Sequence, residues 1–296
     1  GHFFAEVIFG RFLHLAQNVG TDLLGGHAVA THFHPSIAVV GSGGAGALTT
    51  GKLLLEACAR QGCYGIQTRS VGPQIRGGEA AAMVRLASRP IDSASDRFDL
   101  LLAMDWNNVE RFAAEIPLDP DSLIICDPAA GDIPPAIAKS NAQVREVEIG
   151  ALAKQIKQGR GNMIALGVLA EIIDLPQESV DFVLAKMLGQ KGEEVLKTSL
   201  EAIAIGRSAV FGIDKRPLPV AQRGHGRHWI ISGNEAMGLG AIRGGIRFVA
   251  AYPITPATEI LEWMAPKLPQ VGGALIQAED ELASINMLLG ASFGGV

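Results

Sequence analysis

The chain has 296 residues, 48% hydrophobic and 19% charged, a balance typical of well-packed proteins and long enough for two ordinary domains. Its net charge of −5 gives no electrostatic case for a nucleic acid partner. Charged residues interrupt the apolar amino-terminal stretch, so we expect neither a signal peptide nor a membrane span.

The first part of the chain predicts an extension and then an α/β domain. Residues 1–34 form the extension, with a helix expected at 3–17, and the domain covers 35–210. It opens with a buried strand (SIAVVG), a tight turn (GSGGAG) and a helix over 47–62. Further strands are expected at 80–87, 99–105 and 122–127, with helical segments after Asn107, near Ala151, over 162–173 and over 191–208. This alternation predicts a mostly parallel sheet covered on both faces.

The composition changes at residues 211–227, where two prolines and several basic residues predict a surface linker. A second α/β domain is expected over 228–296. Its helices are expected over 234–245, 257–268 and 281–292, and its strands over 247–252 and 273–277. The pattern stops after about two strand and helix units, so we expect this domain to be incomplete.

The turn GSGGAG matches GxGxxG through Gly41, Gly43 and Gly46. One interpretation is a diphosphate held by backbone amides at the start of a helix. A nicotinamide site also needs an acidic residue about 20 positions later, but this region offers Arg69, which would suit a phosphorylated nicotinamide nucleotide. The alternative is that the glycines only let the strand and the helix pack closely.

A second glycine-rich segment holds Gly72, Pro73, Arg76, Gly77 and Gly78. The guanidinium of an arginine pairs with carboxylate or phosphate in a fixed geometry, so this loop is a candidate for binding an anion or a neighbouring subunit. A solvated turn is the alternative.

In the segment YPITP, prolines 253 and 256 bracket Thr255. Proline fixes its own φ and disfavours helix at the residue before it, so Tyr252 and Thr255 should both be extended. The Thr255 hydroxyl is therefore presented by a stiff segment, which either ends a strand or holds the threonine against a ligand.

Three acidic residues, Glu279, Asp280 and Glu281, stand between an expected strand and an expected helix. The helix dipole accounts for Asp280 and Glu281. Glu279 lies at the carboxyl end of the strand, where open parallel sheets bind their ligands. A partly buried carboxylate there could exchange a proton with a bound heterocycle.

The cysteines Cys58, Cys63 and Cys126 form neither a CxxC pair nor an even set, which suits a reducing cytoplasm. An iron–sulfur cluster usually takes four thiolates, so we expect none held by this chain alone. The histidine pairs at 32/34 and 225/228 have no nearby ligand to complete a metal site.

Two long segments carry a family resemblance. GNEAMGLGAIRGGIRFVAAYPITPATEI followed by GALIQAEDELASINMLLGAS resembles the start of the alpha subunit of 2-oxoacid:ferredoxin oxidoreductases. Residues 36–208, with GSGGAG, RSVGPQIRGG and GNMIALG, are similar to the gamma domain of that family. The gamma-then-alpha order is similar to large subunits that act on 2-oxoglutarate or on several 2-oxoacids. The implied fold is a gamma-type parallel-sheet domain followed by the start of a thiamine diphosphate pyrimidine-binding-type α/β domain.

The resemblance also implies the chemistry and the partners. Thiamine diphosphate would bind between this chain and a beta subunit that holds the diphosphate, Mg²⁺ and an iron–sulfur cluster. Thr255 would hydrogen-bond the 2-oxoacid, with Tyr252 and Pro253 shaping the pocket, and Glu279 would bond a ring nitrogen of the aminopyrimidine. Coenzyme A would take the acyl group after loss of CO2, and ferredoxin the electrons. The implied assembly is a cytoplasmic dimer of heterodimers, inactive without the beta subunit.

Two other hypotheses stay open. GSGGAG and Arg69 could belong to an NADP-binding Rossmann-type reductase subunit, or the chain could be a non-catalytic assembly subunit. The cofactor and metal content of the native complex would distinguish the three.

Overall fold

The computed structural model describes residues 34–71, 79–218, 229–255 and 257–296. Three features expected from the sequence lie outside these ranges: the helix at 3–17, the loop that holds Gly72, Pro73, Arg76, Gly77 and Gly78, and the histidine pair at 225/228.

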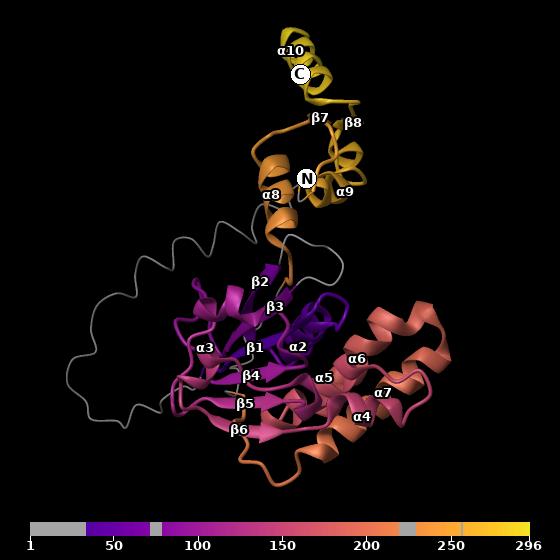
Figure 1. The fold of residues 1–296 in the computed structure, drawn as a ribbon. Helices are drawn as coiled ribbons and strands as arrows, with labels where there is room; N and C mark the ends of the chain where they lie inside the picture. Colours follow the sequence, from indigo (N-terminus) through magenta and orange to yellow (C-terminus); the bar gives the residue numbers. More distant parts are fainter. Residues whose placement is uncertain (1–33, 72–78, 219–228, 256) are drawn as a thin grey trace, which may run out of the picture.

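A six-stranded sheet with the order β2-β3-β1-β4-β5-β6 forms the first unit (Figure 1). Its strands are β1 (Ser36–Ser42), β2 (Tyr64–Val71), β3 (Glu79–Ala87), β4 (Leu100–Ala103), β5 (Leu123–Cys126) and β6 (Gln143–Glu146). Strands β1, β4, β5 and β6 pair in parallel, which confirms the predicted mostly parallel sheet. The exception is β3, which runs antiparallel to both β1 and β2.

The direction of β3 follows from the length of its connection to β2. Only residues 72–78 separate the two strands, whereas a parallel crossover needs about a dozen residues or more. The two strands therefore form a hairpin, and β3 inserts between β1 and β2. Strand β2 was not expected from the sequence, where the strands predicted after the first helix begin only at residue 80.

Helices gather on one face of this sheet, some of them packed on other helices (Figure 1). They are α2 (Ala47–Arg60), α4 (Ile149–Lys154), α5 (Gly161–Ile172), α6 (Gln177–Leu188) and α7 (Glu193–Ala209). Helix α5 is buried over almost its whole length, because α2 and α4 flank it and α7 packs directly on it. The apolar side chains of β1 and β4 that face these helices, including Ile37, Val39 and Leu102, complete the main core.

The opposite face has a smaller core and little helix. Phe98, Phe112, Ile116 and Ile137 cover the other side chains of β1, β4 and β5. The helical segment expected after Asn107 is a pair of short 3-10 turns, Val109–Arg111 and Ala113–Glu115, and α3 (Pro135–Ala138) is a single turn. The prediction of helices on both faces is therefore correct only in part.

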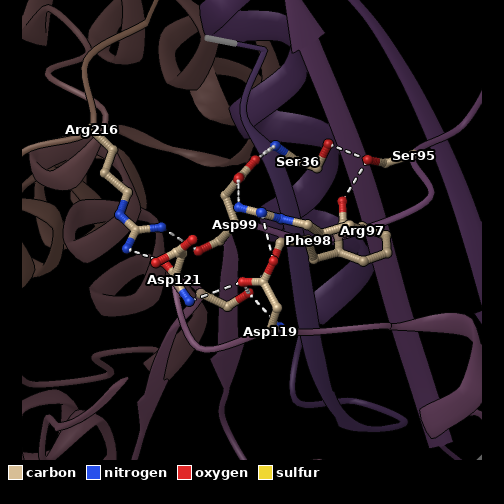
Figure 2. Close-up of polar contacts among 9 residues, drawn as sticks. Ser36, Ser95, Arg97, Phe98, Asp99, Asp119, Asp121 and Arg216 are labelled. Carbon is tan, nitrogen blue, oxygen red and sulfur yellow. Dashed lines mark hydrogen bonds and ion pairs between the residues drawn. The ribbon is translucent and has the colours of Figure 1, made fainter. Parts of the chain in front are cut away.

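The first residues of the expected linker are bound to the amino-terminal edge of the sheet. Arg216 donates from its guanidinium to the carbonyl oxygens of Asp99 (2.6 Å) and Asp121 (2.7 Å), which precede β4 and β5 (Figure 2). The backbone amides of Arg216 and Leu218 donate to the last residues of α5 and its cap, Ile172 and Ile173. We call residues 213–218 the strap.

The strap rests on a polar network at the same edge. Asp99 accepts the Ser36 backbone amide at 2.9 Å, and Arg97 pairs with both Asp99 (2.9 Å) and Asp119 (2.6 Å), as Figure 2 shows. These contacts hold together the starts of β1, β4 and β5, so the strap is anchored on a fixed surface.

Replacing Arg216 by alanine should detach the strap. Two hydrogen bonds from a charged donor are lost, and the Asp121 carbonyl loses this partner while the Asp99 carbonyl keeps the Leu123 amide, so the free energy of unfolding should fall by about 1.5 to 3 kcal/mol. Urea unfolding measures the change. Lys215→Ala is the matched control: Asp174 and then Glu171 raise the pKa of Lys215, but this exposed ion pair should contribute much less to stability. Equal losses in both variants would show that the strap is held by something other than Arg216.

The second unit contains α8 (Gly233–Arg243), β7 (Phe248–Ala251), α9 (Thr258–Met264), β8 (Ala274–Gln277) and α10 (Glu281–Phe293). Each element matches one predicted from the sequence. Helix α9 ends earlier than expected, because Pro266 has no backbone amide to continue the hydrogen-bond ladder. Strands β7 and β8 form a two-stranded parallel sheet.

Helix α10 contains no buried residue in the described chain. Its apolar side chains include Leu282, Leu289 and Phe293, which are 73%, 63% and 98% exposed. Two strands provide too little surface to bury the helices around them. Separately, no helix of the described segments is both long and apolar enough to cross a bilayer.

Candidate functional site

The carboxyl edge of β7 and β8 brings the two predicted site segments together. Ala251, the last residue of β7, pairs with Gln277, the last residue of β8, and the Ala278 amide donates to the Ala251 carbonyl at 3.0 Å. The segment Tyr252–Thr255 and Glu279 therefore leave two neighbouring strand ends on the same edge. This is where open parallel sheets place their ligands.

The YPITP segment turns directly into α9, since the Thr258 amide donates to the Ile254 carbonyl at 3.0 Å. Helix α9 begins without a side-chain cap, and the Thr255 hydroxyl has no hydrogen-bond partner among the described residues. Thr255 is exposed, as is Tyr252, whereas Pro253 is half-buried. The threonine is thus presented to solvent and does not serve as a helix cap.

Asp280 and Glu279 differ in the way that their positions predict. Asp280 is the N-cap of α10 and accepts the Ala283 amide at 2.6 Å. Glu279 has no such bond within the described chain and is exposed, although a partly buried position was expected. The burial differs because the two strands and their helices do not enclose the strand edge. Glu279 is therefore available to a ligand that covers this edge.

A cleft of about 810 Å³ lies at the carboxyl edge of the six-stranded sheet. Its walls come from the GSGGAG turn, the residues after β4 and β5, the starts of α4 and α5, and the 3-10 turn Gly189–Lys191. Lys52, Arg160 and Lys191 line it from three different elements. The carboxylate of Asp127, the acidic residue of this lining, already accepts hydrogen bonds from the backbone amides of Ala129 and Gly150.

Two helix amino termini meet in this cleft, those of α2 and α5. Asn162, in the first turn of α5, is only 8% exposed, and its side-chain amide has no partner among the described residues. It lies against Gly46, where a Cβ would come within 2.7 Å of the Asn162 amide nitrogen and where φ is +94°. The glycine lets the two helix starts approach, and helix starts with basic neighbours favour an anion.

The phosphorylated-nicotinamide hypothesis finds no support in this arrangement. Arg69 pairs with Ala82 of β3, which in turn pairs with Val39, so it lies two strands from β1 and level with that strand's middle. In addition, the Asp105 carboxylate already accepts both the amide and the hydroxyl of Ser42 at 2.8 Å. The first hydrogen-bond donors of the turn are therefore already bound to a carboxylate.

The three cysteines are buried and free. Burial raises the pKa of the Cys58 and Cys63 thiols and that of Cys126, whose neighbours Glu146 and Asp127 raise it further. Thiols with a raised pKa are poor nucleophiles near neutral pH, so they add nothing to either site.

Comparison with known proteins matches residues 36–209 to the family described as pyruvate ferredoxin/flavodoxin oxidoreductase. Residues 239–296 match its thiamine diphosphate-binding family, pyruvate flavodoxin/ferredoxin oxidoreductase. The chain belongs to the pyruvate ferredoxin/flavodoxin oxidoreductase family. The resemblance drawn from YPITP and the glycine-rich segments is thereby confirmed.

Three members of this group show how the chain relates to whole proteins. The 2-oxoglutarate synthase subunit KorA of Methanocaldococcus jannaschii is 58% identical over 66 residues, 22% of this chain and 18% of the relative. KorC of Archaeoglobus fulgidus is 28% identical over 175 residues, 58% of this chain and 88% of the relative. The solved 2-oxoglutarate:ferredoxin oxidoreductase of Magnetococcus marinus, with 2-oxoglutarate, coenzyme A and succinyl-CoA bound, has a TM-score of 0.77 and 36% identity over 88% of this chain and 46% of its own. The chain thus spans less than half of that protein.

The residues at the β7–β8 edge fit the aminopyrimidine end of thiamine diphosphate. Glu279 offers an unengaged carboxylate beside the stiff segment that carries Thr255, which suits a ring nitrogen next to a substrate. Both residues are candidates from the sequence alone. The sequence gives no sign of Asn162, because its contact with Gly46 joins segments far apart in the chain.

Proposed function

We propose that this chain is the large-subunit component of a thiamine diphosphate-dependent 2-oxoacid:ferredoxin oxidoreductase. The enzyme decarboxylates a 2-oxoacid, 2-oxoglutarate being favoured, to acyl-CoA and CO2, and passes the electrons to ferredoxin. One observation supports this most: neighbouring ends of β7 and β8 carry Thr255 and Glu279, whose side chains bond no other described residue, in a chain of this family.

The residues of this chain have three tasks in the proposed reaction. Glu279 holds and moves a proton at a ring nitrogen of the cofactor. Thr255 donates a hydrogen bond to the 2-oxoacid, and Tyr252 and Pro253 shape the wall around it. Thiamine diphosphate, when bound, supplies the electron sink that decarboxylation needs, and the protein orients it.

The remaining parts are assigned to a beta subunit. In this proposal it holds the diphosphate, Mg²⁺ and an iron–sulfur cluster, as the family resemblance implies. The exposed strand edge and the exposed α10 leave surface for it to cover. The assembly is a dimer of heterodimers in the cytoplasm.

The complete assembly should reduce a viologen dye or ferredoxin only when 2-oxoacid, coenzyme A and thiamine diphosphate are all present. This chain without the beta subunit should be inactive.

Thr255→Ala should lower kcat/KM for the 2-oxoacid by roughly 10- to 150-fold, since a hydrogen bond to a charged group contributes about 1.5 to 3 kcal/mol. Its Tm should not change, because the hydroxyl bonds nothing in the described chain.

Thr258→Ala, at the first position of α9, is the matched control and should behave like the parent. Activity of this polypeptide alone, or reduction of NADP without a 2-oxoacid, would refute the proposed function. Loss of stability in Thr255→Ala with normal kinetics would return Thr255 to a structural role.

The cleft around Asn162 is proposed to bind the phosphate-bearing end of coenzyme A. Support comes from three features: two helix starts that favour an anion, the Asn162 amide with no partner among the described residues, and basic side chains from three elements. The relative from Magnetococcus marinus was solved with coenzyme A bound.

Asn162→Asp should raise the coenzyme A concentration for half-maximal rate by roughly tenfold or more, because a carboxylate would repel the phosphates and cannot donate a hydrogen bond. Half-saturation by the 2-oxoacid should stay unchanged. Asn141→Asp makes the same substitution in the exposed turn before β6, which tolerates aspartate, and should have no effect on either value. Unchanged coenzyme A dependence in Asn162→Asp would place this ligand elsewhere.

A further inference from the structure

Helices α8 and α9 are joined at two points, one turn apart on each helix. At the first, the Asn234 side-chain amide donates to a Glu259 carboxylate oxygen at 2.8 Å. At the second, a Cβ on Gly238 would lie 2.8 Å from the Trp263 ring and 3.0 Å from Met264. Residues four apart lie on one face of a helix, so the two contacts are in register and the helices run side by side in the same direction.

The two contacts differ in what they hold. Gly238 fixes the later part of α9 by close packing and alone would leave the start of the helix free to pivot. The Asn234–Glu259 bond fixes that start, because Glu259 is the second residue of α9. Thr255 lies four residues before Glu259. The backbone hydrogen bond from the Thr258 amide to the Ile254 carbonyl spans Thr255 and ties it to the start of α9.

Asn234 is itself held in place. It stands in the first turn of α8, inside a capping box in which the Glu235 amide donates to the Ser232 hydroxyl and the Ser232 amide donates to the Glu235 carboxylate. A reciprocal cap of this kind removes fraying at the start of a helix. The amide of Asn234 is therefore a fixed point against which α9 can be oriented.

We propose that Asn234 and Glu259 are a positioning pair for the substrate threonine: their hydrogen bond sets the direction of the first turn of α9 and so the place of Thr255. In this role neither side chain needs to contact the substrate. The inference rests on the proposed role of Thr255. A displacement of about 1 Å at a substrate-binding group can cost up to roughly 100-fold in rate, so a loosened helix start is sufficient to affect catalysis.

The test measures steady-state kinetics of the complete assembly for parent, Glu259→Ala, Glu259→Gln, Asn234→Ala and the double alanine variant. Glu259→Ala should lower kcat/KM for the 2-oxoacid by about tenfold, mainly through kcat, with half-saturation by coenzyme A and the Tm unchanged. Glu259→Gln keeps an acceptor oxygen for Asn234 and should restore most of the activity. The double variant should be no worse than Asn234→Ala, because that single variant already removes the bond to Glu259.

Glu262→Ala removes the same charge from an exposed position of α9 that has no recorded partner among the described residues, and it should match the parent. The inference is overturned if Glu259→Ala equals Glu262→Ala, if Glu259→Gln is as poor as Glu259→Ala, or if the single effects add. Thr255→Ala, measured in the same series, separates the two levels of proposal. A normal Thr255→Ala variant would refute the substrate role of Thr255, whereas a defective one with a normal Glu259→Ala refutes only the positioning pair.

Discussion

Replacing Glu279 by glutamine should lower 2-oxoacid oxidation by roughly 100-fold or more, the scale usual for groups that exchange a proton. Glutamine keeps the shape of the side chain, but its amide cannot take up and return a proton at a ring nitrogen. Because Glu279 is exposed and makes no hydrogen bond in the described chain, the substitution should leave the folded structure intact. The assay compares parent and variant assemblies, with bound thiamine diphosphate measured by mass spectrometry.

The neighbouring acid provides the control for charge. Asp280→Asn keeps an N-cap for α10 and removes one negative charge near a helix start, a change that contributes only about 0.3 to 1 kcal/mol. Its activity should therefore stay within a few fold of the parent. Equal activity of Glu279→Gln and the parent at equal cofactor occupancy would mean that the cofactor meets a different strand end.

Gly206→Ala should produce the largest loss of stability, about 3 kcal/mol or more, in the upper range for overpacked cores. A Cβ at this position would lie 2.2 Å from the backbone oxygen of Ile164, and the reciprocal Gly167 would bring one equally close to Ile203. Backbone atoms cannot rotate away as side chains do. Helices α5 and α7 would have to separate, and α5 is the buried centre of the main core.

Thermal and urea unfolding of the variant measures this effect. Gly189→Ala is the control, since its φ of −56° is helical and a Cβ there meets no described atom within 4 Å. That substitution should be neutral or slightly stabilising, because alanine restricts the unfolded chain. If the two variants unfold alike, the close approach of α5 and α7 contributes little to stability.

The fold was predictable where apolar patterns were strong. The buried strands β1, β4 and β5 and every element of the second unit follow from short apolar runs bounded by glycine, proline or acidic residues. Strand β6 was not predicted, because its four residues are all exposed and show no alternation. Helix α6 was also missed, although Val180, Val183 and Leu184 have helical spacing and Pro176 precedes it.

The candidate sites, too, were predictable only where the local sequence carried the signal. Thr255 and Glu279 were located from local rules, since proline stiffens a segment and strand ends bind ligands. The cleft around Asn162 depends on contacts between α2 and α5, and the pair Asn234–Glu259 on the register of two helices. Tertiary packing alone creates such contacts, so no local pattern could indicate them. The short connection before β3 was a usable signal for the hairpin.

The strap and the cleft around Asn162 lie at opposite edges of one sheet. The strap binds where β4 and β5 start, and the cleft opens where they end. A strand of four residues is about 13 Å long, beyond the roughly 7 to 10 Å over which substitutions usually influence one another. We therefore expect that the strap can be loosened or shortened by engineering without changing the affinity of the cleft around Asn162 for its proposed ligand.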